Sequence, residues 1–124
     1  MTESEPYTSG QVLTTESPSK FVSILTEKFS ETRVRESSHY TTGEYVKMNL
    51  DSDIEFFFEH IDGSEYLVAG EGDDLRLLEE TAAELAKLFA SKKFKCRFET
   101  YDREDQLTRY SHYAWPPLGK PSVD

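Results

Sequence analysis

The sequence predicts an α+β fold: a two-layer domain with a largely antiparallel sheet of about five strands and two helices on one face of it. Three observations lead to this prediction. Apolar residues recur at three- and four-residue spacing in residues 21–29 and 75–89, as in a helix with one buried face. Apolar and polar residues alternate in several other segments, as in half-buried strands. Short turns join most of these segments, so hairpins predominate.

The length of the chain, 124 residues, suits one domain. Residues 1–16 are rich in Thr, Ser, Glu and Gly and show no periodicity, which is typical of a flexible N-terminal tail. Residues 17–115 are expected to form the single α+β domain, in the order α-β-β-β-α-β-β. Residues 116–124, which begin with two prolines, are expected to form a Pro-rich C-terminal tail.

The first helix is predicted to begin at Ser17. Serine is a good N-cap, and Pro18 then occupies the first helical position, where its missing N–H has no partner to lose. A strand through residues 21–25 is the alternative, because two of these residues are β-branched. Residues 32–42 fit either a short edge strand or a loop.

A meander of three strands is predicted next, over residues 44–50, 54–61 and 65–69. Residues 51–53 provide a turn, and the pair at 62–63 is Asp-Gly, a strong hairpin signal. Residues 70–72 then lead to the second helix.

The second helix is predicted to be capped by Asp73 or Asp74. After it, residues 94–101 alternate, with Cys96 on the apolar side. Residues 102–105 are polar enough for a hairpin loop, and the chain returns as a strand or extended arm before the two prolines.

Acidic residues are concentrated in the middle of the chain. The formal net charge is −10, and residues 44–80 contain twelve acids and two bases, which accounts for the whole imbalance. Such a charge repels phosphate backbones, which bind through Lys and Arg, and attracts basic proteins. A plainer role, keeping a small protein in solution, is the alternative.

The cellular setting is predicted from two features. Cys96 is the only cysteine, so no disulfide forms within the chain, and a reducing compartment such as the cytoplasm fits best. The N-terminus carries acids, and no long apolar stretch follows it. We therefore expect no signal peptide and no membrane span.

Two patterns suggest bound ions, but each has a plainer interpretation. The acids at 51, 53, 62 and 65 offer oxygen ligands to a hard cation, yet they lie in turns at opposite ends of one strand, so we expect no metal site. Gly70 and Gly72 lie before a helix, as in a phosphate-binding turn, but the third glycine is absent and two Asp follow. We expect no cofactor.

Catalysis and nucleic-acid binding are also disfavoured. Cys96 with a histidine (His39, His60 or His112) could form a nucleophile and its base, but its alternation predicts a core position. The basic cluster near residues 92–97 lies beside several tyrosines and could bind single-stranded nucleic acid by stacking, but the overall charge opposes it. We predict no catalytic residues.

Aromatic residues crowded into the last predicted hairpin are the least routine feature. Tyr110 and Tyr113 fall on opposite faces of it, so alternation cannot bury both, and Phe57 falls on the outer face of its own strand. Exposed aromatic side chains with charged neighbours are typical of protein interfaces. A covering role, in which the arm around Trp115 folds back over its own sheet, is the alternative. The candidate partner-binding residues are Glu55, Phe57, Glu59, Tyr101, Tyr110, Tyr113 and Trp115.

The sequence therefore favours a small acidic protein-binding module, of the inhibitor, immunity or adaptor type, that docks on a basic partner. One alternative is a small-molecule-binding or enzymatic domain with a pocket between helices and sheet, using His60 and tyrosines. Another is a structural domain that forms a homodimer, so the chain is expected to be a monomer or a homodimer.

Overall fold

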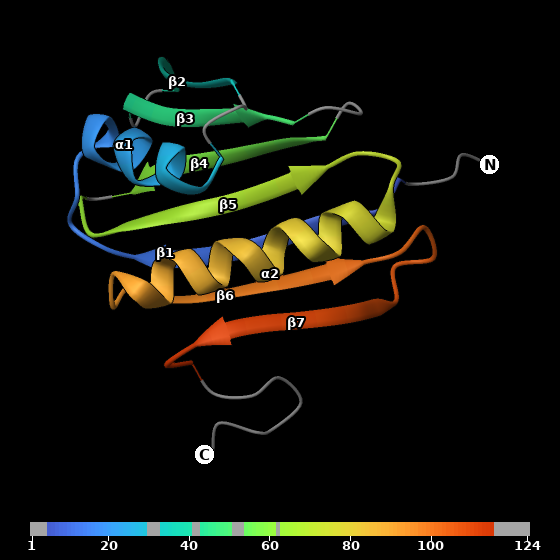
Figure 1. The fold of residues 1–124 in the computed structure, drawn as a ribbon. Helices are drawn as coiled ribbons and strands as arrows, with labels where there is room; N and C mark the ends of the chain where they lie inside the picture. The colour runs from blue at the N-terminus through green and yellow to red at the C-terminus, as the bar shows by residue number, and fades with distance from the viewer. Residues whose placement is uncertain (1–4, 30–32, 41–42, 51–53, 62, 116–124) are drawn as a thin grey trace.

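A computed structural model describes residues 5–29, 33–40, 43–50, 54–61 and 63–115, with the backbone alone for 33–40 and 43–45. Two helices lie against one antiparallel sheet of seven strands (Figure 1). The elements are β1 (Tyr7–Leu13), α1 (Pro18–Lys28), β2 (Arg33–Tyr40), β3 (Gly43–Asn49), β4 (Glu55–Ile61), β5 (Glu65–Glu71), α2 (Leu75–Ser91), β6 (Lys95–Tyr101) and β7 (Leu107–Tyr113).

The predicted α+β class is confirmed, but the strand count and the element order differ from the prediction. The sheet order is β2-β3-β4-β5-β1-β6-β7. The prediction of a flexible tail over residues 1–16 is wrong for Tyr7–Leu13, because β1 lies in the sheet between β5 and β6 and pairs with both. Residues 33–40, which the sequence left open, form the edge strand β2. The predicted C-terminal tail, residues 116–124, lies outside the described residues.

Both helices begin where the sequence predicts. The Ser17 hydroxyl accepts a hydrogen bond from the Lys20 backbone N–H at 3.3 Å, with Pro18 at the start of α1. The Asp74 carboxylate accepts from the Leu77 N–H at 3.1 Å at the start of α2. Figure 1 shows both helices on the same face of the sheet, α1 near β2 and β3 and α2 along β1, β6 and β7. Neither helix is both long and apolar enough to cross a lipid bilayer.

The core lies between the helices and the sheet and is rich in aromatic rings. Phe21 of α1 is fully buried and stacks on Tyr66 of β5 with ring centroids 4.0 Å apart, and on Phe89 of α2 at 5.4 Å. Phe58 of β4 meets the same Phe21 ring edge-on. These contacts join the two helices to the centre of the sheet, which explains why both cover one face.

Glycines on the two central strands make room for large core rings. A Cβ atom at Gly70 would lie 2.5 Å from a ring carbon of Phe56, and one at Gly10 would lie 2.6 Å from a ring carbon of Phe98. Both rings are fully buried. Gly70 lies within β5, where its lack of a side chain leaves room for Phe56. Because β5 continues through Glu71, the link predicted at 70–72 begins two residues later, at Gly72.

Candidate functional site

The face of the sheet turned away from the helices is the candidate functional site, and we call it the open face. Among the described elements, no helix covers it (Figure 1). Its side chains are those that alternate with the core residues along each strand. Strand pairing aligns them in rows, and one row runs through Lys47, Phe57, Ala69, Ser9, Glu99 and Tyr110.

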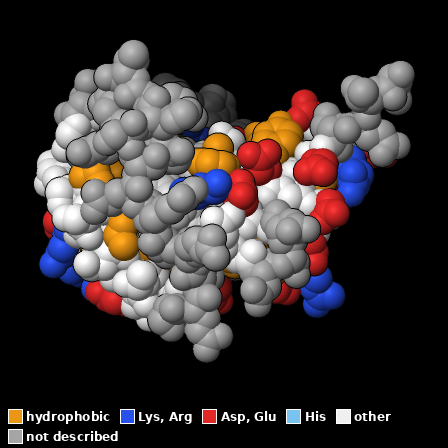
Figure 2. Space-filling model, turned by 90° about the horizontal axis from the view of Figure 1, so that it is seen from above, with side chains coloured by type: hydrophobic (Ala, Val, Ile, Leu, Met, Phe, Trp, Pro, Cys, Tyr) orange, Lys and Arg blue, Asp and Glu red, His pale blue; other side chains and the backbone are white. Residues whose placement is uncertain are grey.

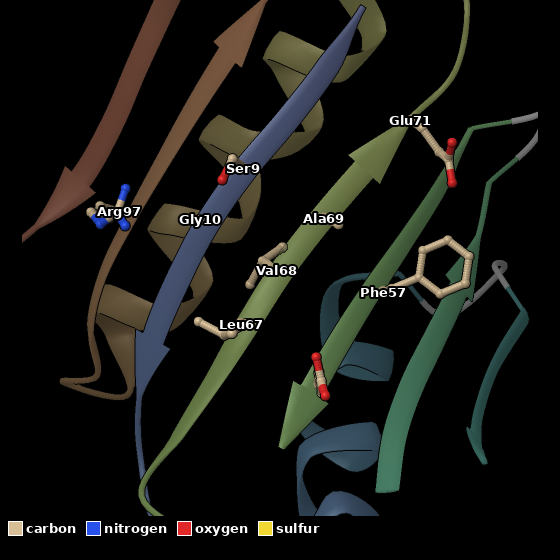
Figure 3. Close-up of a pocket in the computed structure, with 9 residues that line it drawn as sticks. Ser9, Gly10, Phe57, Leu67, Val68, Ala69, Glu71 and Arg97 are labelled. Atoms are coloured by element: carbon tan, nitrogen blue, oxygen red, sulfur yellow. The ribbon is translucent and has the colours of Figure 1, made fainter. Parts of the chain in front are cut away.

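The middle of the open face is hollowed because this row contains small residues at its centre. Ala69 of β5 and Ser9 of β1 are adjacent, and both are exposed. Larger side chains surround them: Phe57 on β4, Leu67 on β5 and Arg97 on β6. The hollow has a volume of about 530 Å³ and is also lined by Glu59 and Glu71 (Figure 3).

One side of the open face is held together by a chain of hydrogen bonds across three strands. Arg97 donates from Nη1 to Glu99 at 2.8 Å and from Nη2 to Gln11 at 3.2 Å. Gln11 in turn donates to Glu65 of β5 at 3.1 Å. The other Glu99 oxygen accepts from the Tyr101 hydroxyl at 2.7 Å. Both terminal nitrogens of the Arg97 guanidinium thus already donate hydrogen bonds within the open face.

The opposite side, on β3 and β4, is also arranged by ionic contacts. Glu55 accepts a hydrogen bond from Asn49 at 2.8 Å and lies 3.6 Å from the Lys47 ammonium. The same ammonium lies 5.5 Å from the centroid of the Phe57 ring, a distance at which a cation is attracted to the ring. Phe57 is therefore an aromatic group already placed beside positive charge.

Two tyrosines stack at the end of the open face near the 102–106 turn. The rings of Tyr7 and Tyr101 lie 5.0 Å apart and 19° from parallel. The Tyr7 hydroxyl donates to Asp105, and this hydrogen bond raises the pKa of Tyr7. The hydrogen bond from the Tyr101 hydroxyl to Glu99 raises the pKa of Tyr101 to about 12. Both hydroxyls donate their hydrogen bonds to carboxylates.

The strands of the open face carry five of the seven predicted partner-binding residues. The open face carries Glu55, Phe57, Glu59, Tyr101 and Tyr110. Tyr113 lies opposite Cys96 and packs against the core, so it is on the helix side. Tyr110, which stacks on His112 at 4.8 Å, is on the other side of the same strand, as the alternation of a strand requires.

Trp115 follows a turn that directs it back toward the sheet. Ala114 has a φ of 58°, in the left-handed region that non-glycine residues seldom adopt. The Trp115 ring then lies 5.6 Å from the Arg97 guanidinium carbon. This contact agrees with the expectation that the arm folds back over its own sheet, as far as Trp115.

Several residues of the hollow were missed by sequence reasoning. Ser9 comes from β1, which was predicted to be part of a flexible tail. Ala69 and Leu67 line the hollow only because β1 pairs with β5 and places Ser9 next to them. The available signal was the alternation of buried Thr8, Gly10 and Val12 with more exposed neighbours. This signal is weak because threonine and glycine are not recognisably apolar.

The other candidates show no converging chemistry where the structure describes their side chains. Cys96 is fully buried, as predicted, and burial raises the pKa of its thiol to about 12. His60 stacks on Tyr66 at 4.5 Å. Within the described residues, no three His, Cys, Asp or Glu side chains are placed to hold a metal ion; the predicted turn acids at 51, 53 and 62 lie outside that part of the chain.

Two of the four bases in the cluster near residues 92–97 form ion pairs with acids. Lys92 forms an ion pair with Glu27 of α1 at 2.9 Å, and Arg97 pairs with Glu99 at 2.8 Å. In Figure 2, acidic side chains lie beside hydrophobic ones at the described surface.

No protein-family model, curated protein or solved structure matches this chain. A functional assignment therefore depends on the arrangement of the open face.

Proposed function

We propose that this chain is a small acidic protein-binding module, of the inhibitor, immunity or adaptor type, that docks on a basic surface of another protein through its open face. The observation that carries the proposal is the hollow between Phe57, Leu67 and Arg97, on a sheet face that no described helix covers. A concave apolar centre with charged groups around it is the usual anatomy of a protein interface.

Charge on the open face favours a basic partner. The described side chains on it include five carboxylates against three cations: Glu55, Glu59, Glu65, Glu71 and Glu99 against Lys47, Lys95 and Arg97. Two of the three cations already pair with carboxylates of the same face. Together with the net charge of −10, this face attracts basic proteins and speeds their encounter.

Exposed apolar surface supports docking rather than simple solubility. Leu67 is 41% exposed at the centre of the sheet, and Phe57 is half-buried beside it. A strand face that only kept the protein in solution would place polar residues at these two positions. Burial of the apolar centre would stabilise the complex, and the acids would orient the partner protein as it docks.

The alternative of a ligand pocket between helices and sheet receives less support. The rings of Phe21, Phe58 and Phe89, which lie between the layers, are fully buried and stacked on one another or edge-on. The hollow lies on the other face of the sheet, and its openness to solvent suits a partner surface better than a small molecule that must be enclosed.

The test is affinity capture from the native cell extract with the full chain as bait. Three baits are compared: the wild type, the double variant Glu59→Lys and Glu71→Lys on the open face, and the control Glu79→Lys and Glu80→Lys on α2. Both variants change the net charge equally. Circular dichroism establishes that each bait is folded, and retained proteins are identified by mass spectrometry at low and high salt.

The proposal predicts a basic protein that the wild type and the α2 control retain at low salt, that high salt releases, and that the open-face variant loses. Equal loss from both variants would mean that net charge alone drives retention, and would refute docking through the open face. Retention of no protein by the wild type at either salt would refute the proposed function.

A further inference from the structure

We propose that the hollow of the open face binds an arginine side chain of the partner, together with an apolar side chain next to it. This inference rests on the proposed function and specifies the group that the open face recognises. It is drawn from three features of the hollow: its small floor, its unpaired carboxylate and its aromatic wall.

The floor of the hollow is shaped to admit a side chain from outside. Ala69 and Ser9 lie on adjacent central strands and are directly opposite each other in the register. Phe57 and Leu67 rise beside them (Figure 3). A volume of about 530 Å³ exceeds that of one side chain, so an arginine and an adjacent apolar residue fit together, with the apolar group and the arginine stem against Leu67 and Ala69.

Charge selects a cation for this space. Glu71 lines the hollow and is exposed, and within the described part of the chain its carboxylate makes no hydrogen bond or ion pair. Glu59 lines the hollow on the neighbouring strand and adds a second negative charge. The positive group at the far wall, Arg97, already donates to Glu99 and Gln11 and lies against Trp115. An anion entering the hollow would therefore meet two carboxylates and an engaged guanidinium.

Arginine fits these surroundings better than lysine does. A guanidinium can donate two parallel hydrogen bonds to one carboxylate, here that of Glu71, and can stack on an aromatic ring at the same time. Phe57 offers that ring at the wall of the hollow. The Lys47 ammonium, 5.5 Å from the centroid of this ring, shows that the ring already attracts one cation within the protein. Lysine could use only one of these contacts at a time.

The probe is the peptide acetyl-Leu-Arg-Leu-amide, titrated into the ¹⁵N-labelled full chain and followed by amide chemical shifts. The matched control peptide carries citrulline instead of arginine, which keeps the shape and removes the charge. We expect saturable shifts at Ser9, Leu67 and Ala69 with the arginine peptide, and binding at least about fivefold weaker with citrulline, because a charge-assisted hydrogen bond is lost.

Three variants locate the binding. Glu71→Gln removes the carboxylate and should weaken the arginine peptide about fivefold. Ala69→Leu fills an exposed position on the floor and should abolish the shifts. Glu79→Gln makes the same charge change on α2 and should leave the affinity unchanged. The amide spectrum of each variant shows whether it is folded.

Shifts spread over the acidic surface, equal affinity for the citrulline peptide, or an equal effect of Glu71→Gln and Glu79→Gln would each overturn the inference. These results are distinguishable from failure of the proposed function. If the peptide does not bind in the hollow but the open-face charge reversal still releases the captured partner, the arginine assignment alone is refuted. If no partner depends on the open face, the proposed function falls whatever the peptide does.

Discussion

Replacing Gly70 by alanine should destabilise the domain, although β5 is a strand and alanine is normally better tolerated there than glycine. The reason is the ring of Phe56 on the adjacent strand. A Cβ atom at position 70 would lie 2.5, 2.7 and 2.9 Å from three carbons of this ring. Carbon atoms pack best at about 3.5–4.0 Å, so the ring must move by about 1 Å.

The size of the expected destabilisation depends on how little the Phe56 ring can move. Phe56 is fully buried and stacks on Phe58 with ring centroids 6.4 Å apart. Adding atoms to a packed core costs about 1–3 kcal/mol. The loss of chain entropy in the unfolded state returns about 0.4–1 kcal/mol. The free energy of unfolding should therefore fall by about 1–2 kcal/mol, and the midpoint of thermal unfolding by roughly 3–8 °C.

The assay is urea unfolding followed by far-ultraviolet circular dichroism, for wild type, Gly70→Ala, Phe56→Leu and the double variant. Leucine lacks the ring carbons nearest to the added methyl group, so alanine at position 70 should cost less in the Phe56→Leu background. The reasoning is refuted if Gly70→Ala is neutral or stabilising in the wild type, or if the two changes are additive, since the contact with Phe56 would then not be the cause.

Three further predictions concern other parts of the fold. Val12→Ala should lower the free energy of unfolding by about 1–2.5 kcal/mol, because Val12 is fully buried in β1; a change below about 0.3 kcal/mol in urea unfolding would mean that residues 7–13 are not part of the sheet. Cys96 should react slowly with iodoacetamide at pH 8 unless urea unfolds the chain, because burial raises its pKa to about 12; labelling of the native protein as fast as that of the unfolded protein would contradict this. Stability should fall as the pH rises from about 10 to 12, because the pKa of Tyr101 is 10.0 in the unfolded chain and about 12 in the fold, so the unfolded state releases its proton first. Tyr101→Phe should make this alkaline loss shallower in urea unfolding at several pH values, and an unchanged slope would assign the loss to other groups.

Local signals in the sequence were sufficient for most of the helices and strands. Ser17 and Asp74 mark helix starts because their side chains satisfy backbone donors within three residues. The alternation in residues 94–101 placed Cys96 and Phe98 in the core, where both are fully buried. These predictions depend only on residues close together in the chain, and the fold class follows from them.

The candidate site could be predicted only in part, for a reason visible in β1. The open-face positions of Phe57 and Glu59 follow from alternation within one strand. The hollow depends on Ser9 lying beside Ala69, two residues far apart in the chain that only the pairing of β1 with β5 brings together. Alternation places Tyr110 and Tyr113 on opposite sides of β7, but only the structure shows that the side of Tyr113 faces the core.

By itself, the sequence determined the α+β class, the residues at which the helices begin, the buried side of most strands and the concentration of acids in residues 44–80. The tertiary structure alone decided that residues 7–13 complete the centre of the sheet. The physical reason is that Thr8 and Gly10 are weak signals in isolation. The buried Thr8 hydroxyl finds its hydrogen-bond partner in Thr100 at 2.9 Å. Gly10 is needed because a Cβ atom there would lie 2.5 Å from the Arg97 carbonyl oxygen and 2.6 Å from a ring carbon of Phe98.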